Sequence, residues 1–143
     1  MNGGWIEQVR SLLDAAAPAV LTTYRKDGSA FVSPVWFRWN DGAFEWVIAE
    51  GDVKLRHLAA NPECILLVFE TVRPFRGVEV HGRPDRIDAD VAAARREIAG
   101  RYLGKEAGER YAAERTKPGV LLRLVPRDPR VWDLTPILPS EPG

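Results

Sequence analysis

Two cationic side chains, Lys54 and Arg56, lie two residues apart directly after an apolar stretch of the chain. They follow Asp52, a residue type that commonly caps the N-terminus of a helix. The first N–H groups of a helix have no partners within it and the helix dipole is positive at that end, so an anion is stabilised there. The segment is therefore a candidate phosphate site. The alternative is a capped surface helix with no ligand.

A second candidate lies in the apolar segment 31–39, which has a proline inside a strand-like pattern. Pro34 cannot donate a backbone hydrogen bond, and proline is normally confined to edge strands or bulges. The backbone groups of Ser33, Val35 and Trp36 could then pair with the polar edge of a planar heterocycle, while the Trp36 ring offers flat apolar contact. The alternative is an ordinary sheet edge whose aromatic residues belong to the core.

Composition limits the class of protein. The 143 residues, 45% of them hydrophobic, suit one domain with a substantial core. Twenty basic residues balance twenty acidic ones, so we expect neither nucleic acid nor a membrane as partner, and any anion site must be local. No apolar run approaches the roughly 20 residues that span a bilayer, and Met1 to Trp5 lacks a signal-peptide pattern. We expect a cytoplasmic protein.

Side chains that commonly carry out catalysis are scarce in this chain. The single cysteine, Cys64, lies in an apolar strand pattern and is expected to pack in the core. His57 and His81 are not accompanied by a zinc-binding cluster, a G-x-S-x-G motif or a P-loop. His81 falls on the polar face of its strand, where a surface or interface role is expected rather than general base catalysis. We predict neither a metal site nor a protein nucleophile.

Hydrophobic periodicity predicts helices in four segments: 5–17, the turns after Asp52 up to Asn61-Pro62, 88–103, and 106–115. The last two are expected to pack outside the sheet. Strands are predicted at 19–24, 30–39, 43–49, 64–69, 77–87 and 119–125, with an extension over 131–134 left open. Strand 64–69 is apolar on both faces and should therefore lie at the centre of the sheet. The short connections favour an antiparallel sheet closed into a small barrel and disfavour a doubly wound α/β fold.

Several segments occur in the order found in one known family. They are Ala19-Val20-Leu21-Thr22-Thr23 with the Asp27-Gly28 turn, Val32-Ser33-Pro34-Val35-Trp36-Phe37, Val53-Lys54-Leu55-Arg56-His57-Leu58 with Asn61-Pro62, Val78-Glu79-Val80-His81-Gly82-Arg83, and Arg101-Tyr102-Leu103-Gly104. From Ala19 to about Trp132 the chain resembles the pyridoxamine 5'-phosphate oxidase-like split β-barrel flavoproteins, including the flavin- and deazaflavin-dependent oxidoreductases.

The resemblance implies a mainly β fold, a six-stranded antiparallel split β-barrel with flanking helices. Length, periodicity and proline content together predict one domain over residues 1–135, with the helix at 5–17, the barrel at 19–134 and a Pro-rich tail at 136–143. The resemblance also implies a homodimer with two cofactor sites at the interface, each holding FMN or the deazaflavin coenzyme F-420. The cofactor-binding residues carried over by position are Ser33, Pro34, Val35, Trp36, Ile48, Ala49, Lys54 and Arg56. Arg76 or Trp132 is also expected to reach a cofactor site, either that of its own subunit or that of the partner subunit.

Two positions depart from the family pattern. Asp52 occupies a position where several relatives carry a cation or a small polar residue, and His57 replaces a common asparagine. The Asp52 carboxylate would weaken phosphate binding unless capping the helix occupies it.

The function implied is hydride transfer between the bound coenzyme and a small organic substrate, with chemistry centred on the cofactor. FMN and F-420 remain alternatives. A different class of function is a non-catalytic split barrel that stores or carries a flavin or haem, and a third is an interaction module without cofactor. Dimerisation is also expected because five tryptophans in so short a chain give more apolar surface than one barrel can bury.

Overall fold

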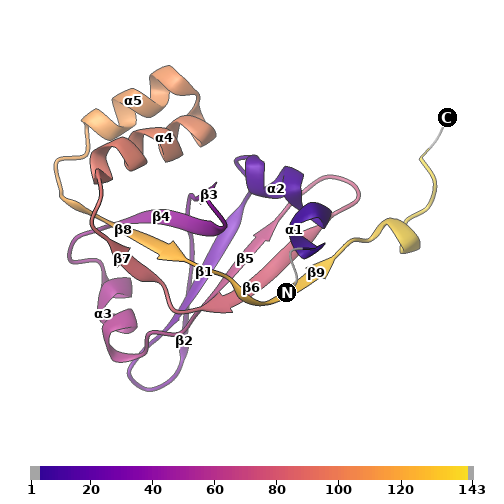
Figure 1. Cartoon of the computed structure of the whole chain (residues 1–143), viewed down its shortest axis with the longest axis horizontal. Coiled ribbons are helices and arrows are strands. Elements are labelled where there is room, and N and C mark those ends of the chain that lie inside the picture. Colours follow the sequence, from indigo (N-terminus) through magenta and orange to yellow (C-terminus); the bar gives the residue numbers. More distant parts are fainter. Residues whose placement is uncertain (1–3, 142–143) are drawn as a thin grey trace.

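Two antiparallel sheets form the framework of the computed structural model, which describes residues 4–141 (Figure 1). The five-stranded sheet has the order β2 (Ala30–Pro34), β1 (Ala19–Tyr24), β5 (Cys64–Phe69), β6 (Gly77–Gly82) and β9 (Arg127–Trp132). The four-stranded sheet has the order β3 (Arg38–Asn40), β4 (Ala43–Ala49), β8 (Gly119–Leu124) and β7 (Asp85–Ile87). The predicted hairpin of the first two strands and the central place of 64–69 are confirmed.

Two predicted strands are wrong in extent, because each breaks where the chain passes from one sheet to the other. Segment 30–39 divides into β2 and β3, and segment 77–87 divides into β6 and β7. Pro34 and Pro84 lie at these breaks, where a missing N–H interrupts the strand ladder. Residues 127–132 do not extend β8 but form β9, paired with β6.

The described residues therefore contain nine strands instead of six, and their pairing forms two separate sheets. The expected mainly β, antiparallel α+β architecture is confirmed. A continuously hydrogen-bonded barrel is not seen within residues 4–141.

Helices surround this framework, with α4 and α5 at the upper left of the view, α3 at the lower left, and α1 and α2 on the opposite side (Figure 1). The single helix expected over 5–17 is instead α1 (Gly4–Gln8) and α2 (Arg10–Asp14), separated by the non-helical backbone of Val9. The other helices are α3 (Val53–Ala60), α4 (Val91–Leu103), α5 (Lys105–Ala113) and the short η1 (Thr135–Ile137) in the expected tail, whose residues 142–143 lie outside the described part. As expected, α4 packs on the outside of β4 and β8. Within residues 4–141, no helix has the length and hydrophobicity needed to cross a bilayer.

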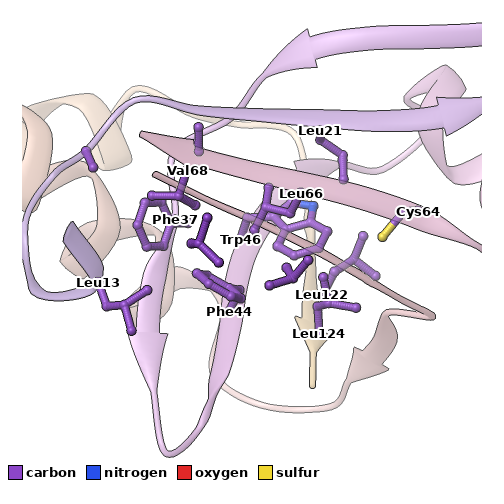
Figure 2. Close-up of a cluster of buried hydrophobic side chains, with 14 of the residues drawn as sticks. Leu13, Leu21, Phe37, Phe44, Trp46, Cys64, Leu66, Val68, Leu122 and Leu124 are labelled. Atoms are coloured by element: carbon purple, nitrogen blue, oxygen red, sulfur yellow. The ribbon is translucent and has the colours of Figure 1, made fainter. Parts of the chain in front are cut away.

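Side chains from both sheets meet in one core (Figure 2). Leu21 and Leu66 from the five-stranded sheet face Trp46 and Leu122 from the other, and all four are buried. Burying each of these side chains contributes about 1.5–3 kcal/mol. Cys64 belongs to this cluster, and burial raises the pKa of its thiol to about 12, so it stays protonated and packs as expected.

The opposite face of the five-stranded sheet is mainly apolar over β2, β1 and β5. We call it the outer face and define it by Val20, Thr22, Val32, Ile65 and Leu67. The register places Val20 between Leu67 and Pro34, and Thr22 between Ile65 and Val32. Val32 is 61% exposed and the other four are partly exposed.

Glycines allow α4 and α5 to pack closely. A Cβ added at Gly108 would lie 2.5 Å from Gly100 Cα, a backbone contact that side-chain motion cannot relieve. We expect Gly108→Ala to lower the free energy of unfolding by about 1–3 kcal/mol, as overpacked sites do. Gly100→Ala is the matched control, because its Cβ would meet only Lys105 Cα, at 3.9 Å. Urea denaturation checks both variants, and equal stabilities would contradict this packing.

Candidate functional site

A cavity of about 310 Å³ lies where the β2–β3 connection, the end of β4, the start of α3 and helices α4 and α5 converge. Its lining residues are Pro34, Val35, Trp36, Val47, Ile48, Ala49, Asp52, Lys54, Arg95, Ile98, Ala99 and Tyr111. The cavity thus brings together the predicted residues of segment 34–36, the end of β4 and Lys54. Its volume is at the low end of the roughly 300–1,000 Å³ typical of ligand pockets.

The strand side of the cavity is formed at a sheet edge. Pro34 ends β2, the edge strand of the five-stranded sheet, as its lack of an N–H predicts. The Val35 N–H, one of the groups predicted to be free, donates to Ala19 O at 3.0 Å. Ser33 does not line the cavity, and its buried hydroxyl has no hydrogen-bond partner within residues 4–141.

An aromatic cluster holds Trp36 in place. The Trp36 ring stacks on Tyr102, with centroids 5.1 Å apart and planes 9° apart, and lies 5.2 Å from the Tyr111 ring. Burial raises the pKa of Tyr102 against a smaller opposing effect of its hydrogen bond with Phe37, so the phenol stays protonated. It donates to Ala17 O at 2.8 Å and accepts from the Phe37 N–H at 3.3 Å. These contacts position the apolar wall of the cavity.

The start of α3 has the cap that the sequence indicates. Gly51 has φ +87°, a conformation that suits glycine in the turn from β4 to the helix. The Asp52 carboxylate accepts a hydrogen bond from the Lys54 N–H at 2.8 Å, and its other oxygen lies 3.2 Å from Lys54 Nζ. The Asp52 carboxylate, whose negative charge the sequence analysis noted, thus has two partners: it caps α3 and it is the counter-ion of Lys54.

Sequence reasoning missed five of the lining residues, Val47, Arg95, Ile98, Ala99 and Tyr111, and Arg95 is the charged one among them. It comes from α4, and its Nη1 donates to Lys117 O at 3.4 Å. A helix rich in charged residues gives no local signal that one of its arginines, 41 residues after Lys54 in the chain, faces the same cavity as Lys54. With Lys54, Arg95 and Asp52 as its charged lining residues, the cavity carries a net positive charge.

Arg56, the second predicted phosphate-binding cation, does not line this cavity. It lines a different cavity of about 440 Å³, together with Arg25, Lys26 and His57. Two residues along a helix turn by about 200°, so Lys54 and Arg56 point to opposite sides of α3. His57 is 9% exposed, and its Nδ1 lies 2.9 Å from Thr23 Oγ1.

Arg76 and Trp132 do not line the cavity either. Arg76 Nε forms an ion pair with Glu70 at 2.8 Å, and this hydrogen bond with Glu70 is the main reason that the pKa of Arg76 is raised. Trp132 pairs with Gly77, next to Arg76, and a Cβ at Gly77 would overlap its ring. The two residues are therefore neighbours at one end of the five-stranded sheet. Within residues 4–141, no group of three or more His, Cys, Asp or Glu residues is arranged to hold a metal ion.

Comparisons with solved structures identify the fold. A conserved hypothetical protein, Rv2991 from Mycobacterium tuberculosis, matches with a TM-score of 0.76 and 20% identity over 96% of this chain and 90% of that one. An F-420 reductase matches with a TM-score of 0.63 and 24% identity over 85% and 94% of the two chains. HutZ, the haem storage protein of Vibrio cholerae, matches with a TM-score of 0.65 and 15% identity over 89% and 92%.

At these identities, the structural likenesses establish the fold alone. Among curated protein sequences, none matches this chain. The family model described as pyridoxamine 5'-phosphate oxidase matches residues 6–133, which is nearly the whole chain. The split-barrel strands, the capped helix α3 and this match lead to one conclusion: the chain belongs to the pyridoxamine 5'-phosphate oxidase family.

Proposed function

We propose that this protein is a cytoplasmic oxidoreductase that binds FMN or coenzyme F-420 and transfers a hydride between that coenzyme and a small organic substrate. The observation that carries the proposal is the cavity, which combines an aromatic wall, a sheet edge, a helix N-terminus and two cationic side chains. When bound, the coenzyme would supply the redox-active ring. The protein would supply binding, orientation and exclusion of water.

Each wall of the cavity has a role in this proposal. Lys54 and Arg95 would hold the phosphate close to the positive end of the α3 dipole, where the potential suits an anion. Ile48 and Ala49 would contact the ribityl chain or the ring. Trp36, fixed by its stack on Tyr102, would face the ring and keep water from it.

A homodimer would complete the site, because a cavity of about 310 Å³ is small for a whole flavin nucleotide. We propose that the outer face is the dimer interface, since its apolar side chains are only partly covered by the single chain. Arg76 and Trp132 line no part of this chain's own cavity, so a role for them at a site requires the second subunit.

Titration of the purified protein with FMN and with F-420, followed by optical absorbance and fluorescence, tests the proposal and decides between the two coenzymes. We expect micromolar or tighter binding of one of them, and oxidation or reduction of that coenzyme in the presence of a substrate. Binding of neither coenzyme would refute the proposal.

Asp52 gives a sharper test of where the phosphate binds. Asparagine caps a helix about as well as aspartate does but carries no charge. Asp52→Asn therefore keeps the cap and removes the negative charge that would repel the phosphate. We expect this variant to bind the phosphorylated coenzyme about three- to ten-fold more tightly, since the charge removed is worth about 1 kcal/mol. Weaker binding by Asp52→Asn at unchanged thermal stability would contradict the assignment. Asp52→Ala is the control, and it should lose about 1 kcal/mol of stability with the cap.

The non-catalytic alternatives have less support in the site. A haem carrier with a histidine axial ligand would need that histidine at the cavity, but His57 is buried against Thr23, and the partly exposed His81 lies beside Glu79 on β6. Neither histidine lines the cavity. A flavin carrier would show tight binding without turnover, so the same titration followed by a turnover assay separates it from the enzyme.

A further inference from the structure

The two cations of the cavity differ in how far their charges are already compensated. Lys54 Nζ lies 3.2 Å from the Asp52 carboxylate, and the Lys54 side chain is 15% exposed. Arg95 forms no ion pair with another residue in the range 4–141, and its one side-chain hydrogen bond in that range is the 3.4 Å bond to Lys117 O. Because a guanidinium has five N–H donors, most of the donors of Arg95 are available to a ligand.

The surrounding residues leave room for this guanidinium. Gly119 begins β8 directly beside it, and a Cβ at that position would overlap Arg95 Nη2 and lie 2.7 Å from Val47 Cγ1. Ile98 and Ala99 follow Arg95 by three and four residues on α4, so they share its helix face and line the same cavity. The apolar side chains on that face keep the Arg95 side chain partly buried at the cavity wall.

We propose that Arg95 is the principal anion-binding residue of the cavity, with Lys54 in second place because Asp52 already neutralises it. This inference rests on the proposed function for the identity of the ligand, a phosphorylated coenzyme. The planar guanidinium can donate two parallel hydrogen bonds to phosphate oxygens, which an ammonium group cannot do. A hydrogen bond of 3.4 Å to Lys117 O is long enough to be exchanged for a charged acceptor.

A purely structural role is the competing explanation. In that case Arg95 would only fasten α4 to the segment before β8 through Lys117 O, and its replacement would change stability without changing anion affinity. The two roles therefore predict different binding constants for a simple anion.

The test uses inorganic pyrophosphate and the protein free of coenzyme, with binding measured by isothermal titration calorimetry. We expect Arg95→Gln to weaken binding about 10- to 100-fold, the usual effect of losing a charge-assisted hydrogen-bonding pair. Arg95→Lys should recover part of the affinity. The matched control is Arg96→Gln, at the next position of the same helix, which is exposed and does not line the cavity. Wild-type affinity in Arg95→Gln, equal losses in both glutamine variants, or failure of the wild type to bind pyrophosphate would overturn the inference.

A second arm separates this inference from the proposed function. FMN and F-420 are titrated into the wild type and Arg95→Gln, with riboflavin as the ligand that lacks a phosphate. If pyrophosphate binds through Arg95 while neither coenzyme binds, the proposed function fails and the anion site stands. If a coenzyme binds equally to the wild type and Arg95→Gln, the assignment of Arg95 fails and the proposed function stands.

Discussion

Replacing Glu45 with alanine is expected to lower the free energy of unfolding by about 3–5 kcal/mol, the usual cost of breaking a buried ion pair. Glu45 is 3% exposed and lies on β4. Arg38 Nε donates to one carboxylate oxygen at 2.8 Å, and Arg123 Nη1 donates to the other at 2.6 Å. The alanine variant would leave both guanidinium groups partly buried without their shared counter-ion. Urea denaturation at neutral pH measures the loss.

Glu97→Ala is the control for this network. Glu97 also accepts a hydrogen bond from Arg38, at 2.6 Å, but its side chain is 60% exposed. Exposed ion pairs contribute at most about 1 kcal/mol, so Glu97→Ala should stay close to the wild type. If the two alanine variants lost equal stability, burial would not be the cause of the effect.

The same network makes stability depend on pH. Burial alone would raise the pKa of Glu45, but the hydrogen bonds from Arg123 and Arg38 outweigh it and hold the pKa below the ordinary 4.5. A carboxylate with a lowered folded-state pKa stabilises the protein fully above its unfolded pKa. The contribution is then lost as pH falls from about 4.5 through the lowered value. The free energy of unfolding of Glu45→Gln should therefore fall less steeply than that of the wild type as pH drops below about 4.5. An equally steep fall in the two proteins would contradict this.

Replacing Leu67 with arginine is expected to convert the proposed dimer to monomers while leaving the fold intact. Leu67 lies on β5 at the border of the outer face, opposite Val20 on β1 and Glu79 on β6. A charge placed within an apolar interface should cost about 2–4 kcal/mol, or roughly 30- to 1,000-fold in the dimer dissociation constant. Because the side chain is partly exposed in the single chain, the arginine can reach solvent in the monomer.

Light scattering at micromolar concentration measures the effect, with circular dichroism to check the fold. Leu103→Arg is the matched control, because Leu103 is 43% exposed at the end of α4, the helix that packs on the other sheet. A dimeric Leu67→Arg, or a wild type that is monomeric under these conditions, would show that the outer face is not the interface.

Local sequence signals predicted much of the fold. Asp52 before Lys54 and Asn61-Pro62 at the other end define α3, because caps and helix stops act over a few residues. The divisions of 30–39 and 77–87 were missed. Apolar residues, Val35 to Phe37, continue through the first break and hide the change of sheet, whereas the second break, at Arg83-Pro84, is polar and was read as part of one long strand. Pro34 and Pro84 were the available signals.

The candidate site was predictable where its residues are close in sequence. Pro34 to Trp36 and Lys54 reach one cavity, as the family pattern implies. The separation of Arg56 from Lys54 could have been found from the helical turn of about 200° between them. Arg95 could not have been found, because its place at the cavity depends on how α4 lies over β4 and on the space left at Gly119.

A crystal structure of the protein grown with excess FMN or F-420 tests the central claim most directly. We expect the phosphate to lie at the start of α3, within hydrogen-bonding distance of Arg95 and Lys54, and the ring to lie against Trp36. A coenzyme bound in the cavity that Arg56 lines, or an empty cavity beside Lys54 at saturating coenzyme, would contradict the account.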